Sequence, residues 1–165
     1  MSWTIRLSPQ TTANEEAASL VFDPDGHVVT PEPAPQALRV LLAEDEPAMR
    51  DLLVASLNRA GFDVVVARDG GELFDYLAST MVSDTLYPPP DVIVTDVRMP
   101  RIGGLDVLKA ARKIDPTMPI ILVTGFGDTR LHDEARKQGA RAVFDKPFDL
   151  DALTREVRAC ANPWY

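Results

Sequence analysis

Acidic side chains follow two apolar segments of the chain, and their type and position suit the binding of a cation. Glu44 and Asp45 come directly after the segment 38–43, and Asp96 follows the segment 91–95. Short apolar runs bounded by polar residues are typical of buried strands in a parallel sheet. Because ligands bind at the carboxyl ends of such strands, these carboxylates should meet at one edge of the sheet. Carboxylate oxygens are the ligands of a hard cation, and Mg²⁺ is the expected cofactor.

Two further polar residues are expected at the same edge. Thr124 follows the apolar segment 119–123, and Lys146 comes shortly after the segment 140–144. Asp96 has the chemistry of a nucleophile toward a phosphoryl group, and its product would be an acyl phosphate. A cation, the ammonium of Lys146 and the hydroxyl of Thr124 would together stabilise the phosphoryl oxygens. The residue types therefore indicate phosphoryl chemistry.

The elements that position these residues alternate between strand and helix from Ala37 onward. Gly61 stands where a helix end is expected, and Asp149 is placed to cap the last helix. This alternation predicts an α/β fold with a five-stranded parallel sheet, doubly wound so that helices cover both faces. The predicted strands are 38–43, 62–67, 91–96, 119–123 and 140–144. Apolar residues at helical spacing between them include Leu52, Leu53, Leu57, Leu105, Leu108 and Ile114.

The composition restricts the class of protein. With 165 residues, 45% of them hydrophobic, the chain can form one domain with a full core plus an appendage. A formal net charge of −8 argues against a nucleic-acid surface, since no cluster of Lys and Arg offsets the acidic residues. The single cysteine, Cys160, excludes an internal disulfide and suits a reducing compartment. The chain has no signal-like start and no run of about 18 apolar residues, so we expect a cytoplasmic protein without membrane contact.

Parts of the chain outside the alternation set the expected domain boundaries. Residues 1–36 form an N-terminal extension, in which apolar segments flank the turn sequence 23–26 and predict a β-hairpin. Prolines at every second position, Pro31, Pro33 and Pro35, then predict a short extended spacer. We expect the main domain to span 37–161 and a short tail to span 162–165. The connection 79–90 into the third strand is longer than usual.

Five short strings stand at the ends of the predicted strands and in the loops beside them: LLAEDEP at 41–47, VTDVRMP at 94–100, GGL at 103–105, VTG at 123–125 and DKPF at 145–148. In this combination they closely resemble the receiver domain of two-component response regulators. The resemblance implies a flavodoxin-like fold with βα repeated five times. It also implies that Asp96 accepts a phosphoryl group from a histidine kinase or a histidine phosphotransfer protein.

The resemblance further implies how the phosphoacceptor is surrounded. The lysine of the family is followed by a cis peptide, so the bond from Lys146 to Pro147 would be cis, which X-Pro bonds permit at small cost. The implied Mg²⁺ ligands are Glu44, Asp45, Asp96 and the backbone carbonyl of Arg98.

The family also implies a switch. Thr124 is expected to move toward the phosphoryl group, and the surface of the fourth helix, fifth strand and fifth helix, within 129–160, to change its partner preference. The family often has an aromatic residue three positions before its lysine. Val143 stands there in this chain, and Phe144 follows it with a side chain that should point to the opposite face of the sheet.

Two bulky residues stand where the family tunes hydrolysis. Arg98 comes two residues after Asp96, and Phe126 comes two residues after Thr124. We expect them to restrict the access of water and to give a long-lived phosphoryl group.

The expected function is a phosphorylation-dependent signalling switch, and not an enzyme. Because only 162–165 follow the last helix, we expect a single-domain response regulator without DNA-binding output, which acts through protein contact. A phosphatase of the haloacid dehalogenase type would need a carboxylate where Arg98 stands. A phosphorylation-independent receiver-like scaffold is the other alternative, and the complete set of site residues argues against it. The extension is either a loosely packed segment or a partner-binding module.

Overall fold

The computed structural model describes residues 21–22, 28–29, 37–83, 86–125, 127 and 129–160. The chain divides into two compact units, Met1–Gln36 and Ala37–Tyr165. In the first unit, β1 (Val21–Phe22) pairs with β2 (Val28–Val29) in an antiparallel arrangement. The rest of the extension, the C-terminal tail and Phe126 lie outside the described residues.

The second unit is built on one sheet of parallel strands: β3 (Arg39–Ala43), β4 (Asp63–Ala67), β5 (Val92–Asp96), β6 (Ile120–Thr124) and β7 (Ala142–Asp145). This confirms the predicted fold class, and each strand begins and ends within two residues of its predicted bounds. The strands lie in the order β4-β3-β5-β6-β7. The strand order therefore reverses direction between β3 and β5: β4 lies on one side of β3, and β5, β6 and β7 follow on the other side. In open α/β sheets, ligands bind at the carboxyl ends of the strands where the order reverses.

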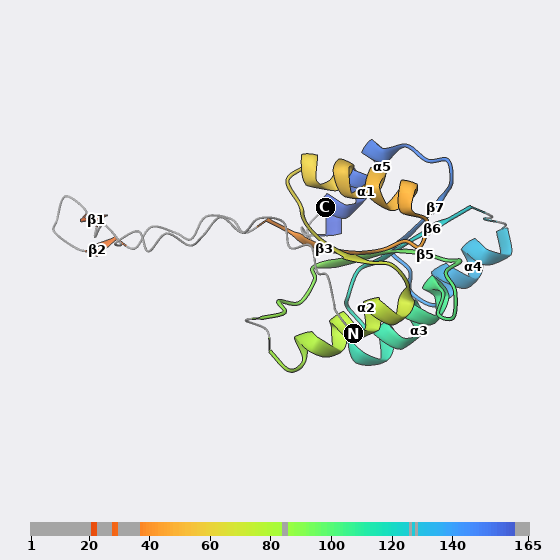
Figure 1. The fold of residues 1–165 in the computed structure, drawn as a ribbon, viewed down its shortest axis with the longest axis horizontal. Helices are drawn as coiled ribbons and strands as arrows, with labels where there is room; N and C mark the ends of the chain where they lie inside the picture. The colour runs from red at the N-terminus through yellow and green to blue at the C-terminus, as the bar shows by residue number, and fades with distance from the viewer. Residues whose placement is uncertain are drawn as a thin grey trace. The chain divides into compact units, whose positions relative to one another are not determined.

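Helices connect the strands and cover both faces of the sheet: α1 (Pro47–Arg59), α2 (Gly70–Thr80), α3 (Gly104–Ile114), α4 (Thr129–Lys137) and α5 (Leu150–Cys160). Figure 1 shows α1 and α5 on one face, and α2, α3 and α4 on the other. The predicted doubly wound arrangement is therefore confirmed.

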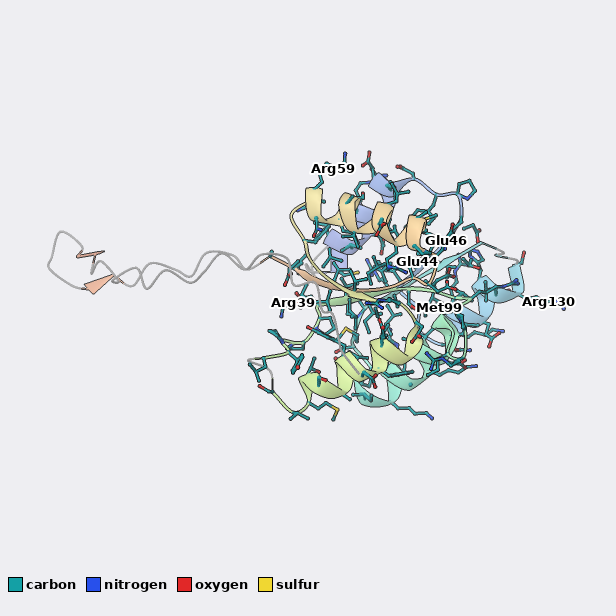
Figure 2. The ribbon with its side chains drawn as sticks, in the orientation of Figure 1. Arg39, Glu44, Glu46, Arg59, Met99 and Arg130 are labelled. Atoms are coloured by element: carbon teal, nitrogen blue, oxygen red, sulfur yellow. The ribbon has the colours of Figure 1, made fainter. Side chains whose placement is uncertain are left out.

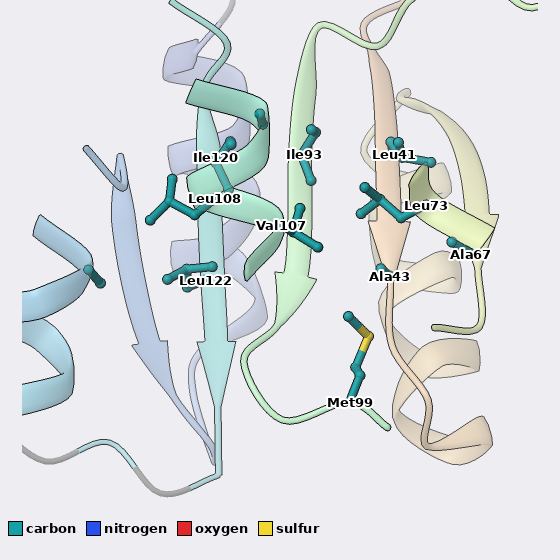
Figure 3. Close-up of a cluster of buried hydrophobic side chains, with 12 residues drawn as sticks. Leu41, Ala43, Ala67, Leu73, Ile93, Met99, Val107, Leu108, Ile120 and Leu122 are labelled. Carbon is teal, nitrogen blue, oxygen red and sulfur yellow. The ribbon is translucent and has the colours of Figure 1, made fainter. Parts of the chain in front are cut away.

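Alternate residues of each strand enter two separate hydrophobic clusters. Leu41 of β3 and Ile93 of β5 pack toward α2 and α3 (Figure 3), whereas Val40 packs toward α1 and α5. Because both faces of the sheet are buried, its strands need apolar residues throughout, and this explains the unbroken apolar runs. The same period of two places Val143 and Phe144 in opposite clusters, which confirms their predicted orientation.

Local sequence signals act at the helix ends as expected. Gly61 ends α1 with a φ of 88°, a left-handed conformation that suits glycine. Asp149 accepts a hydrogen bond from the backbone N–H of Asp151 at 2.9 Å, and so caps α5.

Two apolar residues that the helical spacing assigned to buried faces are exposed to solvent instead. Leu52 is 47% exposed, and Ile114, the last residue of α3, is 60% exposed. Leu53 and Leu57 form the buried stripe of α1 instead. A helix that packs on a sheet buries only one stripe, so its flanking apolar positions remain in water.

Candidate functional site

Three acidic side chains lie together at the carboxyl ends of β3 and β5. Glu44 and Asp45 follow β3, and Asp96 is the last residue of β5, the neighbouring strand. One carboxylate oxygen of each residue lies within 4.8 Å of the others. Glu44 is only 1% exposed, Asp96 is also buried, and Figure 2 shows Glu44 beside the start of α1. Buried carboxylates at this separation repel one another unless a positive charge lies between them.

Lys146 supplies a positive charge to this cluster. Its Nζ donates to Oε2 of Glu44 at 2.7 Å and to Oδ2 of Asp96 at 2.8 Å. Burial raises the pKa of Glu44; the hydrogen bond from Lys146 opposes this rise, and the charge of Asp96 adds to it. Burial by itself would lower the pKa of Lys146, but its hydrogen bonds to Asp96 and Glu44 outweigh burial and raise that pKa. The ammonium group is therefore held in its charged form between two carboxylates.

The ends of β6 and β7 bring Thr124 and Lys146 to the same edge. Thr124 pairs with Asp145 in the sheet, and the backbone N–H of Lys146 donates to the carbonyl oxygen of Thr124 at 2.7 Å. Thr124 is fully buried. The peptide bond from Lys146 to Pro147 is cis, in agreement with the resemblance. The residues collected at this edge are Glu44, Asp45, Asp96, Thr124 and Lys146.

The loop after β5 folds back on Asp96 and is tied to α2. The backbone N–H of Arg98 donates to Oδ1 of Asp96 at 3.0 Å. Arg101 has a positive φ of 67°, and its guanidinium donates to Oδ2 of Asp69 at 2.5 Å. A hydrogen bond from the backbone of Glu72, with a contribution from Arg101, lowers the pKa of Asp69. The N-terminal cap of α2 thus also anchors the loop that carries Arg98.

Two glycines let α3 begin directly against this loop. A Cβ atom on Gly104 would lie 2.5 Å from the carbonyl oxygen of Asp96, and one on Gly103 would lie 2.5 Å from that of Val97. Both separations are too short for carbon and oxygen atoms that are not bonded. Steric contact with the backbone of the loop therefore explains why glycine occupies both positions of the GGL string at 103–105.

Gly104→Ala is expected to lower the free energy of unfolding by about 2 kcal/mol, because the added methyl group forces α3 away from the backbone of Asp96. Urea denaturation measures this loss. Gly125→Ala is the control, since a Cβ atom there meets no atom of the described residues within 4 Å, and its effect should stay below about 0.5 kcal/mol. Equal stability of Gly104→Ala and wild type would contradict the close approach.

Comparison with known proteins decides which family this site belongs to. Residues 40–158 match the family model of the response regulator receiver domain. The chain belongs to the response regulator receiver family. It is thus a receiver domain of a two-component system, and receiver domains are signalling switches. Receiver domains interact with histidine kinases or phosphotransfer proteins, and phosphorylation and Mg²⁺ are expected for the family.

Relatives of this receiver differ in how much of their length it spans. The C4-dicarboxylate transport transcriptional regulatory protein DctD of Pseudomonas aeruginosa is 37% identical over 73% of this chain, but only 24% of DctD is covered. The response regulator receiver protein CpdR of Brucella abortus is 32% identical over 72% of this chain and 92% of CpdR. A receiver domain protein of Clostridium thermocellum has a TM-score of 0.66 at 28% identity, over 76% of this chain and 94% of that chain.

The acidic cluster of this receiver fits a hard divalent cation. Glu44, Asp45 and Asp96 offer carboxylate oxygens that are close enough to share one ion, and such oxygens are the preferred ligands of Mg²⁺. Lys146 contacts two of the same carboxylates, so the ammonium and a cation would compete for them.

Among the described residues, no helix is long and apolar enough to cross a membrane.

Two arginines near the site were not recognised from the sequence. Arg50 donates to the carbonyl oxygens of Glu44 and Asp45, and Arg101 pairs with Asp69. In the sequence, Arg50 is one of several charged residues on a helix, and its only signal is its position shortly after the acidic pair. Arg101 and Asp69 are 32 residues apart in the sequence, and no local pattern connects them.

Proposed function

We propose that this receiver accepts a phosphoryl group on Asp96 and changes its protein-binding surface in response. The observation that carries the proposal is the position of Lys146, whose Nζ binds Asp96 and Glu44 within a cluster of three carboxylates. Burying these charges costs stability, because desolvation and mutual repulsion oppose it. Costs of this kind are concentrated at functional sites, which supports a chemical role for Asp96.

The proposed reaction is a transfer from a phosphohistidine of the partner. An oxygen of Asp96 attacks the phosphorus, and the P–N bond breaks with its electron pair left on the histidine nitrogen, which takes up a proton from solvent. The new P–O bond makes an acyl phosphate. Mg²⁺, when bound, supplies positive charge to the phosphoryl oxygens. Lys146 is placed to contact these oxygens as well, once its bond to the Asp96 carboxylate is exchanged for one to the phosphoryl group.

We propose the remaining roles by analogy with the family. The backbone carbonyl of Arg98 serves as a further Mg²⁺ ligand, and the bond from its N–H to Asp96 supports this because it holds the loop beside the carboxylate. Thr124 donates its hydroxyl to the phosphoryl group from the end of β6. Arg98 and Phe126 limit the access of water, so that the phosphoryl group is long-lived.

The output surface is formed by α4, β7 and α5, within 129–160. Thr124 precedes α4 and Lys146 follows β7, and this connection of the site to two elements of the surface supports the proposal. The phosphoryl donor is a histidine kinase or a phosphotransfer protein, and the second partner is a protein that distinguishes the two states. We favour output by protein contact, through the surface that the receiver itself presents.

Incubation with acetyl phosphate followed by intact-mass spectrometry tests the proposal. With Mg²⁺ we expect a mass increase of one phosphoryl group, and with EDTA in place of Mg²⁺ we expect none. After removal of the donor, persistence of the adduct over minutes supports the role of Arg98 and Phe126, and its loss within seconds contradicts that role. Absence of any modification in Mg²⁺ would favour the phosphorylation-independent scaffold.

A further inference from the structure

Arg50 holds the backbone of the segment that carries the acidic pair. Its Nη1 donates to the carbonyl oxygen of Glu44 at 2.9 Å and to that of Asp45 at 3.2 Å. Its backbone N–H donates to the carbonyl oxygen of Glu46 at 2.9 Å. One residue of α1 thus binds three successive carbonyl groups of the loop between β3 and α1.

This contact restricts where two of the three carboxylates can lie. A guanidinium group is planar and its N–H donors have fixed directions, so it sets the relative orientation of the carbonyl groups that it binds. The Cα positions of Glu44 and Asp45, from which their side chains project, are held as a result. Asp96 is held by the N–H of Arg98 and by Lys146, which also binds the carboxylate of Glu44.

We propose that Arg50 is a positioning residue that sets the affinity of the acidic cluster for Mg²⁺. This inference rests on the proposed function, since it requires that the cluster binds Mg²⁺. Groups that orient the ligands of a metal typically contribute about 10-fold or more to its affinity. The charge of Arg50 acts in the opposite direction, because it repels a second cation. Arg50 is only half-buried, so solvent and salt screen that repulsion and positioning is the larger effect.

Titration with MgCl₂, followed by the NMR shifts of backbone amides, measures this affinity directly. Arg50→Met is expected to weaken Mg²⁺ binding about 10-fold. Arg50→Lys keeps the charge, but its ammonium lies on a flexible stem and its donors rotate freely, so it fixes the two carbonyl groups less firmly and binding should weaken by a smaller factor. Arg59→Met is the matched control, because Arg59 lies exposed at the other end of α1 (Figure 2) and should leave Mg²⁺ binding unchanged.

A second readout separates positioning from a general loss of structure. The Mg²⁺ concentration for half-maximal phosphorylation by acetyl phosphate should rise in Arg50→Met, whereas the rate at saturating Mg²⁺ should stay near that of wild type. Thermal unfolding without Mg²⁺ checks that each variant is folded. If Arg50→Met does not fold, the Mg²⁺ affinity of Arg50→Lys tests the inference instead.

The outcomes are distinguishable. Unchanged or tighter Mg²⁺ binding in the Arg50 variants would overturn the inference and leave the proposed function intact. A wild-type protein without Mg²⁺-dependent shifts at the acidic cluster would overturn both.

Discussion

Asp96→Asn is expected to reduce phosphorylation by acetyl phosphate at least about 1,000-fold, to below detection by intact-mass spectrometry. An amide is not a nucleophile toward phosphorus, and the substitution also removes one of the three carboxylates of the cluster. The side chain keeps its size and an oxygen that can accept the hydrogen bond from the N–H of Arg98. Lys146 keeps Glu44 as its partner, so the variant should remain folded.

A second aspartate of the same strand region is the control for this change. Asp91 directly precedes β5 at the opposite end of the strand, where its carboxylate accepts a hydrogen bond from the backbone N–H of Arg39 at 2.7 Å. Asp91→Asn should therefore be phosphorylated at the wild-type rate. An adduct of equal yield on Asp96→Asn would show that another residue accepts the phosphoryl group and would contradict the proposed function.

Lys146→Met is expected to lower the free energy of unfolding by about 3 kcal/mol at neutral pH without Mg²⁺, because it leaves two buried carboxylates without their shared cation. Lowering the pH should reduce this loss. Burial and the charge of Asp96 already raise the pKa of Glu44, and a protonated Glu44 no longer needs a positive partner. Urea denaturation at two pH values measures both effects.

Added Mg²⁺ should restore part of this stability, and more than it adds to wild type, because the cation no longer competes with the ammonium. The rate of phosphorylation should still fall about 100-fold, since one charge at the phosphoryl oxygens is missing.

Lys109→Met is the control, as the contact of Lys109 with Glu134 at 3.7 Å is half exposed and should contribute less than about 1 kcal/mol. If both lysine variants lost the same stability, the ion pairs of Lys146 would be no more important than a surface contact.

The fold class and the candidate site residues could be derived from the sequence because their signals are local. Each buried strand is a short apolar run, and each polar residue of the site stands at or just beyond the end of such a run. A parallel sheet brings all its carboxyl ends to one edge, so Asp96 and Lys146 could be placed together without any knowledge of distances. Gly61 at the end of α1 and Asp149 at the start of α5 act within one helical turn, so these helix ends could also be predicted from the sequence.

Contacts between distant segments were decided only by the tertiary structure. Lys146 and Glu44 are 102 residues apart, and nothing in the sequence states that one ammonium bridges Glu44 and Asp96. The hold of Arg50 on the acidic loop and the exposure of Leu52 depend on how α1 is rotated on the sheet. Periodicity defines which residues share a face, whereas hydrogen bonds depend on positions to within a few tenths of an ångström, and only the packing of the whole domain determines those positions.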